Sequence, residues 1–136
     1  MSKLRLGIAI FILSMNIAGC SRIDTLNNYS HAAGAGFNAA KLSDKEIGIR
    51  IKKAAMDNKW ACNSINNNQL MCTLNVRDHE AVINIDYTQT GYSIAYVSSK
   101  NLMHNKDKGT IHRNYNKWIK LLRRSIDRTM SMPATY

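Results

Sequence analysis

The chain has 136 residues, which is enough for one domain with a modest core and leaves little room for a deep active site. Hydrophobic residues make up 45% and charged residues 21%, a globular balance that excludes a generally disordered chain. The formal net charge is +10, from 19 Lys and Arg against 9 Asp and Glu, and this excess favours an anionic partner.

The first twenty residues have the layout of an export signal. Lys3 and Arg5 form a short positive region, and residues 6–13 form an apolar run, LGIAIFIL. This run is too short to span a bilayer and has the length of the hydrophobic region of a signal peptide. Removing residues 1–19 takes away only these two cations, so the positive charge belongs to the mature chain.

The end of this segment, Ile17, Ala18, Gly19 and Cys20, resembles the lipobox of bacterial lipoproteins. The resemblance implies cleavage before Cys20, a diacylated Cys20 thiol and an acylated amine, so that lipid anchors the protein in a membrane. Ser21 stands where Asp is linked with inner-membrane retention, which favours the outer membrane and a domain facing the periplasm. An ordinary secretory signal with a coincidental cysteine is the alternative.

The mature chain divides into a tether and one domain. Residues 20–42 have no sustained hydrophobic period, so we expect a flexible tether, with a short packed helix as the alternative. A single domain then covers residues 43–130, and residues 131–136 form a tail.

A helix opens the domain. Ser43 and Glu46 make a capping-box pattern, and apolar residues recur on one helical face from Ile47 onward. We expect this helix to end near Asn58.

Four strands follow, each with a two-residue alternation of side chains. Their expected ranges are 60–65, 70–76, 83–88 and 92–97. Short polar connectors between them predict an antiparallel meander. This arrangement predicts three pairs of opposed residues, Cys62 with Cys72, Leu74 with Ile83, and Ile85 with Ile94.

A last amphipathic helix follows the loop over residues 101–109, with Thr110 as its expected cap. Its apolar face is expected to hold Ile111, Tyr115, Trp118, Ile119, Leu122 and Ile126. Its opposite face is expected to hold Arg113, Lys117, Lys120, Arg124 and Arg128. The sequence therefore predicts an α+β fold: an N-terminal helix, a four-stranded antiparallel meander sheet, and a C-terminal amphipathic helix packed on one sheet face.

The basic side of this last helix is the strongest surface feature, since Asp127 is the only acid between residues 110 and 136. We predict an anion-binding face for anionic lipid head groups, lipopolysaccharide phosphates or an acidic envelope protein. Nucleic acid is not expected as a partner of an exported protein. A solvated face without any partner is the alternative.

Cys62 and Cys72 are the two cysteines that remain once Cys20 carries lipid. An exported compartment is oxidising, and an even remainder favours a disulfide. Opposed positions on neighbouring antiparallel strands also bring the Cα atoms into bridging range. The spacing is not C-x-x-C, so we expect a structural bridge, with two buried free thiols as the alternative.

The four histidines, His31, His79, His104 and His112, do not have the spacing of metal ligands. Nucleophile-elbow, P-loop and dinucleotide-binding motifs are also missing from the sequence. We therefore expect no catalytic residues, no metal and no cofactor. The alternative is a small hydrolase or metal-dependent enzyme in which His104 and His112 approach across a loop beside Asp107.

A pattern in the second half is similar to one found in small proteobacterial lipoproteins of unknown function. It consists of Tyr92-Ser93-Ile94-Ala95-Tyr96, Ser99, Asn101-Leu102, Ile111-His112 and Tyr115-Asn116-Lys117-Trp118-Ile119. The resemblance extends over roughly residues 45–130 and supplies no activity or site residues. We predict a non-enzymatic accessory or binding protein, held by lipid in the periplasm or at the outer membrane.

Overall fold

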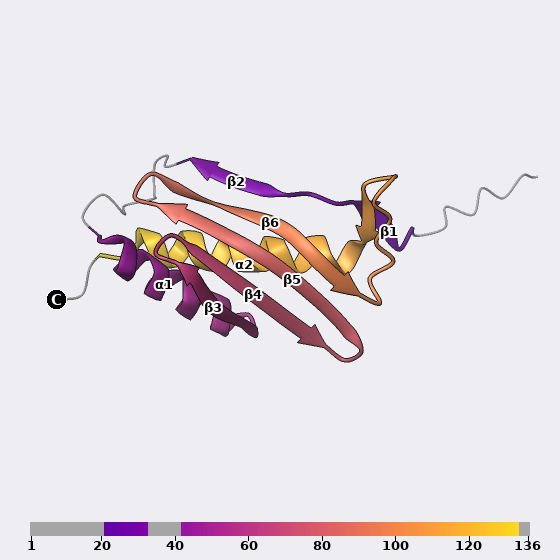
Figure 1. Ribbon diagram of the computed structural model, residues 1–136, viewed down its shortest axis with the longest axis horizontal. Helices are drawn as coiled ribbons and strands as arrows, with labels where there is room; N and C mark the ends of the chain where they lie inside the picture. The colour runs from indigo at the N-terminus through magenta and orange to yellow at the C-terminus, as the bar shows by residue number, and fades with distance from the viewer. Residues whose placement is uncertain (1–20, 33–41, 134–136) are drawn as a thin grey trace, which may run out of the picture.

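The computed structural model describes residues 21–32 and 42–133 (Figure 1). The signal segment and Cys20 with its predicted lipid lie outside the described residues. The described part contains two helices, a five-stranded antiparallel sheet and a two-stranded one. The predicted α+β class is confirmed, although the sheet has one strand more than expected.

Helix α1 (Asp44–Asp57) begins and ends as predicted. The Ser43 Oγ accepts a hydrogen bond from the Glu46 N–H, and the Glu46 carboxylate accepts one from the Ser43 N–H at 2.7 Å. The hydrogen bond from the Ser43 side chain, followed by that from its backbone, lowers the pKa of the Glu46 carboxyl. Asn58 is the C-cap. The buried residues of the helix are Ile47, Gly48, Ile51, Ala54 and Ala55.

The predicted meander forms the body of the large sheet. Its strands are β3 (Trp60–Asn66), β4 (Gln69–Val76), β5 (His79–Thr88) and β6 (Gly91–Lys100). The expected pairs Cys62–Cys72 and Ile85–Ile94 are confirmed. Alternate side chains of these strands form one apolar face, which contributes Trp60, Leu70, Cys72, Leu74, Ala81, Ile83, Ile85, Tyr87, Tyr92 and Ile94 to the core.

The remaining predicted pair, Leu74 with Ile83, is wrong. Leu74 lies opposite Ala81 instead. The turn between β4 and β5 has only two residues, Arg77 and Asp78. Arg77 has a φ of 57°, the left-handed backbone that such a tight turn needs. The register therefore moves by two residues, and a shift of two keeps every side chain on its predicted face.

The predicted flexible tether is wrong for most of residues 21–32. This part of the chain holds β1 (Ile23–Thr25), which pairs with β7 (Thr110–His112), and β2 (Tyr29–Ala32), which pairs with β6. The large sheet therefore has the order β2-β6-β5-β4-β3. Strands of three or four residues are too short to show an alternating pattern of apolar side chains in the sequence. They form because β6 and β7 offer edges with unpaired backbone groups.

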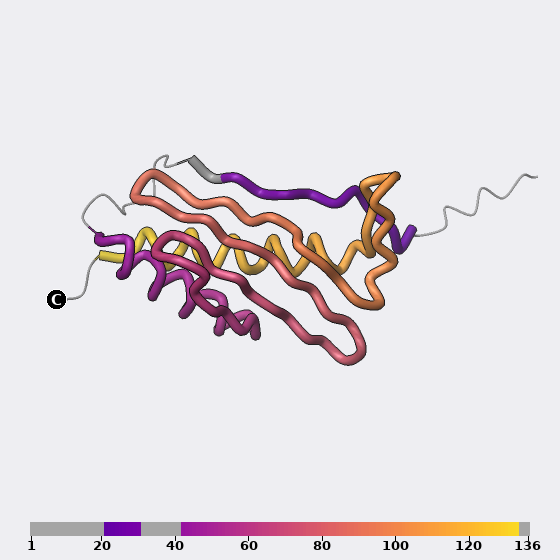
Figure 2. The backbone as a smooth tube through the Cα atoms, viewed as in Figure 1, coloured from indigo at the N-terminus to yellow at the C-terminus, as the bar shows by residue number. Residues whose placement is uncertain are grey.

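Helix α2 (Arg113–Ser131) begins two residues later than expected. Thr110, its predicted cap, lies in β7, and His112 is the N-cap instead. Both helices lie on the same face of the sheet, where α1 packs against α2 and β3 (Figure 2). The Arg50 guanidinium of α1 ties the helices together by donating to the carbonyl oxygens of Thr129 and Met132 at 3.0 and 2.8 Å. Within the described residues, neither helix combines the length and hydropathy needed to cross a membrane.

Candidate functional site

The five predicted cations form one face of α2, called the α2 basic face here. Its members are Arg113, Lys117, Lys120, Arg124 and Arg128. Arg113 is half-buried and the other four are exposed. The side chains of α2 that enter the core are Tyr115, Ile119, Leu122, Ile126 and Met130. At 100° per residue the two sets lie on opposite sides of the helix, and the basic face extends for about 22 Å along its axis.

No described cation of the α2 basic face forms a salt bridge, although the Asp24 carboxylate lies beside the face and accepts a hydrogen bond from the Asn116 side chain at 3.2 Å. Within residues 21–32 and 42–133 the one ion pair joins His79 to Asp78, so no Lys or Arg there has a salt bridge. Asp127, the acid of α2, instead accepts a hydrogen bond of 2.6 Å from the Tyr92 hydroxyl on the sheet. Burial first, and then this carboxylate, raise the pKa of Tyr92 far above its ordinary value. Asp127 is thus bonded to Tyr92 of the sheet and forms no ion pair with the α2 basic face.

The start of the described chain lies beside the first turn of α2. The Arg113 N–H donates to the Arg22 carbonyl at 2.8 Å, and Ile23 lies opposite His112 in the small sheet. The Asn116 side chain then donates to the Thr25 carbonyl at 2.7 Å. These contacts fix residues 22–25 at the N-terminal end of the α2 basic face.

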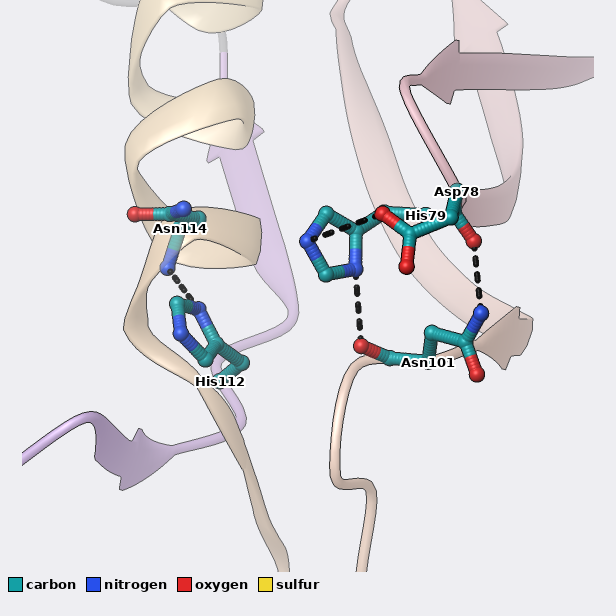
Figure 3. A network of polar contacts seen from close by, with 5 residues as sticks. All are labelled: Asp78, His79, Asn101, His112 and Asn114. Carbon is teal, nitrogen blue, oxygen red and sulfur yellow. Dashed lines mark hydrogen bonds and ion pairs between the residues drawn. The ribbon is translucent and has the colours of Figure 1, made fainter.

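A pair of histidines lies at the same end of the domain (Figure 3). The rings of His79 and His112 stack with centroids 6.1 Å apart. The His79 Nδ1 lies 2.8 Å from the Asn101 carbonyl oxygen, which can only accept, so this nitrogen carries a proton. The His112 Nδ1 accepts from the Asn114 N–H at 3.2 Å, so this nitrogen has none.

The N-cap role of His112 therefore requires its neutral form. Burial lowers the pKa of His112, and the neighbouring charges of His79, Arg113, Arg22 and Lys117 lower it further. All four neighbours are cations when protonated, and two carboxylates lie at the same end of the domain: that of Asp78 is 3.8 Å from the His79 Nε2, and that of Asp24 lies beside Asn116. Sequence reasoning missed this pair, because neither the spacing of the two histidines nor any motif connects them.

The alternative in which His104, His112 and Asp107 come together as a metal site is not supported by the described residues. The His104 ring packs against Tyr96, with centroids 4.4 Å apart. In the part of the chain that the structure describes, no three His, Cys, Asp or Glu side chains form a group able to hold a metal ion. The side chain of His31 lies outside the described residues.

The Cys62–Cys72 disulfide is confirmed. It joins directly opposed residues of β3 and β4, whose Cα atoms are 4.0 Å apart. Cys72 is fully buried and Cys62 is half-buried. The bridge lies on the core face of the sheet, where it holds β3 to the rest of the domain.

Comparisons with known protein families, curated proteins and solved structures found no match for this chain. The resemblance to proteobacterial lipoproteins therefore stays a prediction. A function for the chain has to be argued from its residues and their geometry.

Proposed function

We propose that this chain is a lipid-anchored binding protein of the bacterial cell envelope whose α2 basic face holds the domain against an anionic membrane surface. One observation carries the binding role: five cations share one exposed side of a helix, without a salt bridge to any described acid. The lipid anchor is proposed from the lipobox that ends at Cys20.

The position of the chain start supports a joint action of lipid and charge. Cys20 is bonded to Ser21, and consecutive Cα atoms are about 3.8 Å apart. Arg22 and Ile23 are already fixed beside α2. We therefore propose that a lipid on Cys20, two residues before Arg22 in the sequence, would hold the first turn of α2 near the membrane.

The cations of the α2 basic face can contribute measurably to the free energy of membrane binding. Each cation near an anionic membrane surface contributes about 1 kcal/mol, and salt reduces this over a distance of about 10 Å at 0.1 M. The α2 basic face adds to the hold of the acyl chains and selects an orientation with α2 against the head groups. Phosphate is the shared chemistry of its partners, whether phospholipid or lipopolysaccharide supplies it.

Metabolic labelling with palmitate tests the anchor. The wild-type chain should incorporate the label and the Cys20→Ala variant should not. Equal labelling of both chains would contradict the proposed lipid.

Vesicle co-sedimentation of the unlipidated domain, residues 21–136, tests the surface. Vesicles rich in phosphatidylglycerol, or containing lipopolysaccharide, should bind the domain more tightly than pure phosphatidylcholine, and added salt should weaken binding. The triple variant Lys117→Glu, Lys120→Glu and Arg124→Glu should lose this preference.

A second triple variant is the control. Lys59→Glu, Arg77→Glu and Lys100→Glu change the net charge equally, at exposed positions on the turns and ends of the sheet. The control should keep most of the binding. If both triple variants bind equally, the attraction belongs to the net charge and the α2 basic face has no special role.

A further inference from the structure

Two adjoining hollows run along the seam between α1 and β3, away from the α2 basic face. One is lined by the N-terminal half of α1 and the turn after β3, and the other by Met56, Lys59 and the first half of β3. Lys52 lines both. Together they form a groove, called the β3 groove here, that follows the outer edge of the sheet.

The backbone along this groove has unpaired polar groups. Among the residues that the structure describes, β3 is the last strand of the sheet and pairs only with β4. The Cα separation of 4.0 Å between Cys62 and Cys72 is the short spacing of a pair without mutual backbone hydrogen bonds. The N–H and C=O groups of Cys62 therefore point away from β4, as do those of Trp60 and Ser64. No residue in the described part of the chain bonds to them.

The side chains around the groove combine charge with apolar surface. Three cations line it, Lys45, Lys52 and Lys59, against the single acid Asp44 among its lining residues. Its rim also carries three exposed apolar side chains, with exposed fractions of 56% for Ile49, 51% for Ile65 and 70% for Met56. A sheet edge with free backbone groups and apolar neighbours is a site to which an extended chain can add.

We propose that the β3 groove binds an extended, acidic segment of a partner protein, which adds to the sheet as a further strand beside β3. The outward groups of Trp60, Cys62 and Ser64 supply the backbone hydrogen bonds. Alternate side chains of the segment contact Ile49 and Ile65, and its carboxylates lie near the lysines. A second copy of this chain is the poorer occupant, since two β3 edges would bring like charges together.

The binding test uses the full chain in detergent and a fluorescein-labelled eight-residue peptide that alternates Glu and Val. Fluorescence anisotropy should show binding of this peptide. The matched peptide that alternates Lys and Val should not bind, and neither should a Glu-Val peptide with alternate backbone nitrogens methylated, which keeps the charge and loses the donors. Absence of Glu-Val binding, or equal binding by the methylated peptide, would overturn the proposal.

Amide hydrogen exchange then locates the peptide. On addition of the Glu-Val peptide the amides of Trp60, Cys62 and Ser64 should exchange more slowly. Those of Ala61 and Asn63, which face β4, should be unchanged. Protection confined to α2 would place the peptide on the α2 basic face and overturn the proposal, without affecting the proposed membrane role of α2.

A charge reversal at the groove has a close control on the same helix. Lys52→Glu should weaken Glu-Val binding about fivefold, because one attractive charge is replaced by a repulsive one. Lys53→Glu makes the same change at the next residue, which does not line the groove, and should have little effect. Equal weakening in both variants, or self-association of the chain that the peptide does not reverse, would overturn the proposal.

Discussion

Gly48 shows how closely α1 packs on the sheet. It is buried in α1, and the Tyr87 ring occupies the space where a β-carbon would stand. The Tyr87 Cζ would lie 3.0 Å from such a carbon, and the Oη would be closer still. The hydroxyl also donates to the Asn67 carbonyl at 3.0 Å, which keeps the ring in place. Gly48→Ala must therefore displace either the ring or the helix.

The expected cost of Gly48→Ala combines effects of opposite sign. Alanine favours a helix interior over glycine by about 1 kcal/mol. Overpacking costs about 2 kcal/mol, and losing the Tyr87 hydrogen bond costs about 1 kcal/mol more. The steric cost exceeds the helix gain, so the free energy of unfolding should fall by about 2 kcal/mol.

Urea unfolding of a double-mutant cycle checks this reasoning. Tyr87→Phe removes the closest atom, so Gly48→Ala should cost about 1 kcal/mol less in that background. Gly109→Ala is the control, because a β-carbon added at Gly109 would meet no heavy atom within 4 Å and only the φ of 59° opposes the change. Its cost should not depend on Tyr87. Additive effects of Gly48→Ala and Tyr87→Phe, or stabilisation by Gly48→Ala alone, would refute the proposed collision.

Three further predictions concern stability. Because folding lowers the pKa of His112, the unfolded chain binds a proton at this residue at higher pH than the folded chain does. The contribution of His112 to the free energy of unfolding should therefore be constant above pH 6.5, the ordinary pKa of histidine, and should fall as the pH drops below 6.5. His112→Asn, which keeps an N-cap acceptor, should remove this dependence in denaturation measured across that range. Reducing the Cys62–Cys72 bridge, with its separation of 10 residues, should lower the free energy of unfolding by about 3 kcal/mol, and an unchanged urea midpoint would contradict this. Arg50→Ala should lower the free energy of unfolding, measured by heat or urea, by about 1 kcal/mol, because the hydrogen bonds between the two helices are lost. Arg50→Lys should lower it by less, because lysine keeps the charge and loses the forked donors.

Features of the fold that depend on nearby residues could be predicted from the sequence. The capping box of Ser43 and Glu46 is complete within one turn, so the start of α1 was predictable. The turn before β4 and the turn after β5 were predicted well enough to place Cys62 opposite Cys72 and Ile85 opposite Ile94, whereas the turn between β4 and β5 is shorter than expected. The α2 basic face was also predictable, because a helical period is local.

Features that depend on distant residues could not be predicted. β1 and β2 have no period of their own, and they become strands only because the edges of β7 and β6 reach them. The cap of α2 moved from Thr110 to His112 for the same reason, since pairing with β1 draws Thr110 into a strand. The contact of His79 with His112, and the groove beside β3, likewise exist only once the chain has folded.

The pairing of β1 with β7 also sets the order in which the domain can be completed. A chain is made from its N-terminus, so Ile23 and Asp24 emerge long before their partners His112 and Ile111. Residues 23–25 must remain unpaired during that interval, because loop closure over such a distance awaits the far strand. The segment over residues 23–25 is therefore open while the middle of the domain is being made, and it takes its place in the small sheet only after almost all of the chain has appeared.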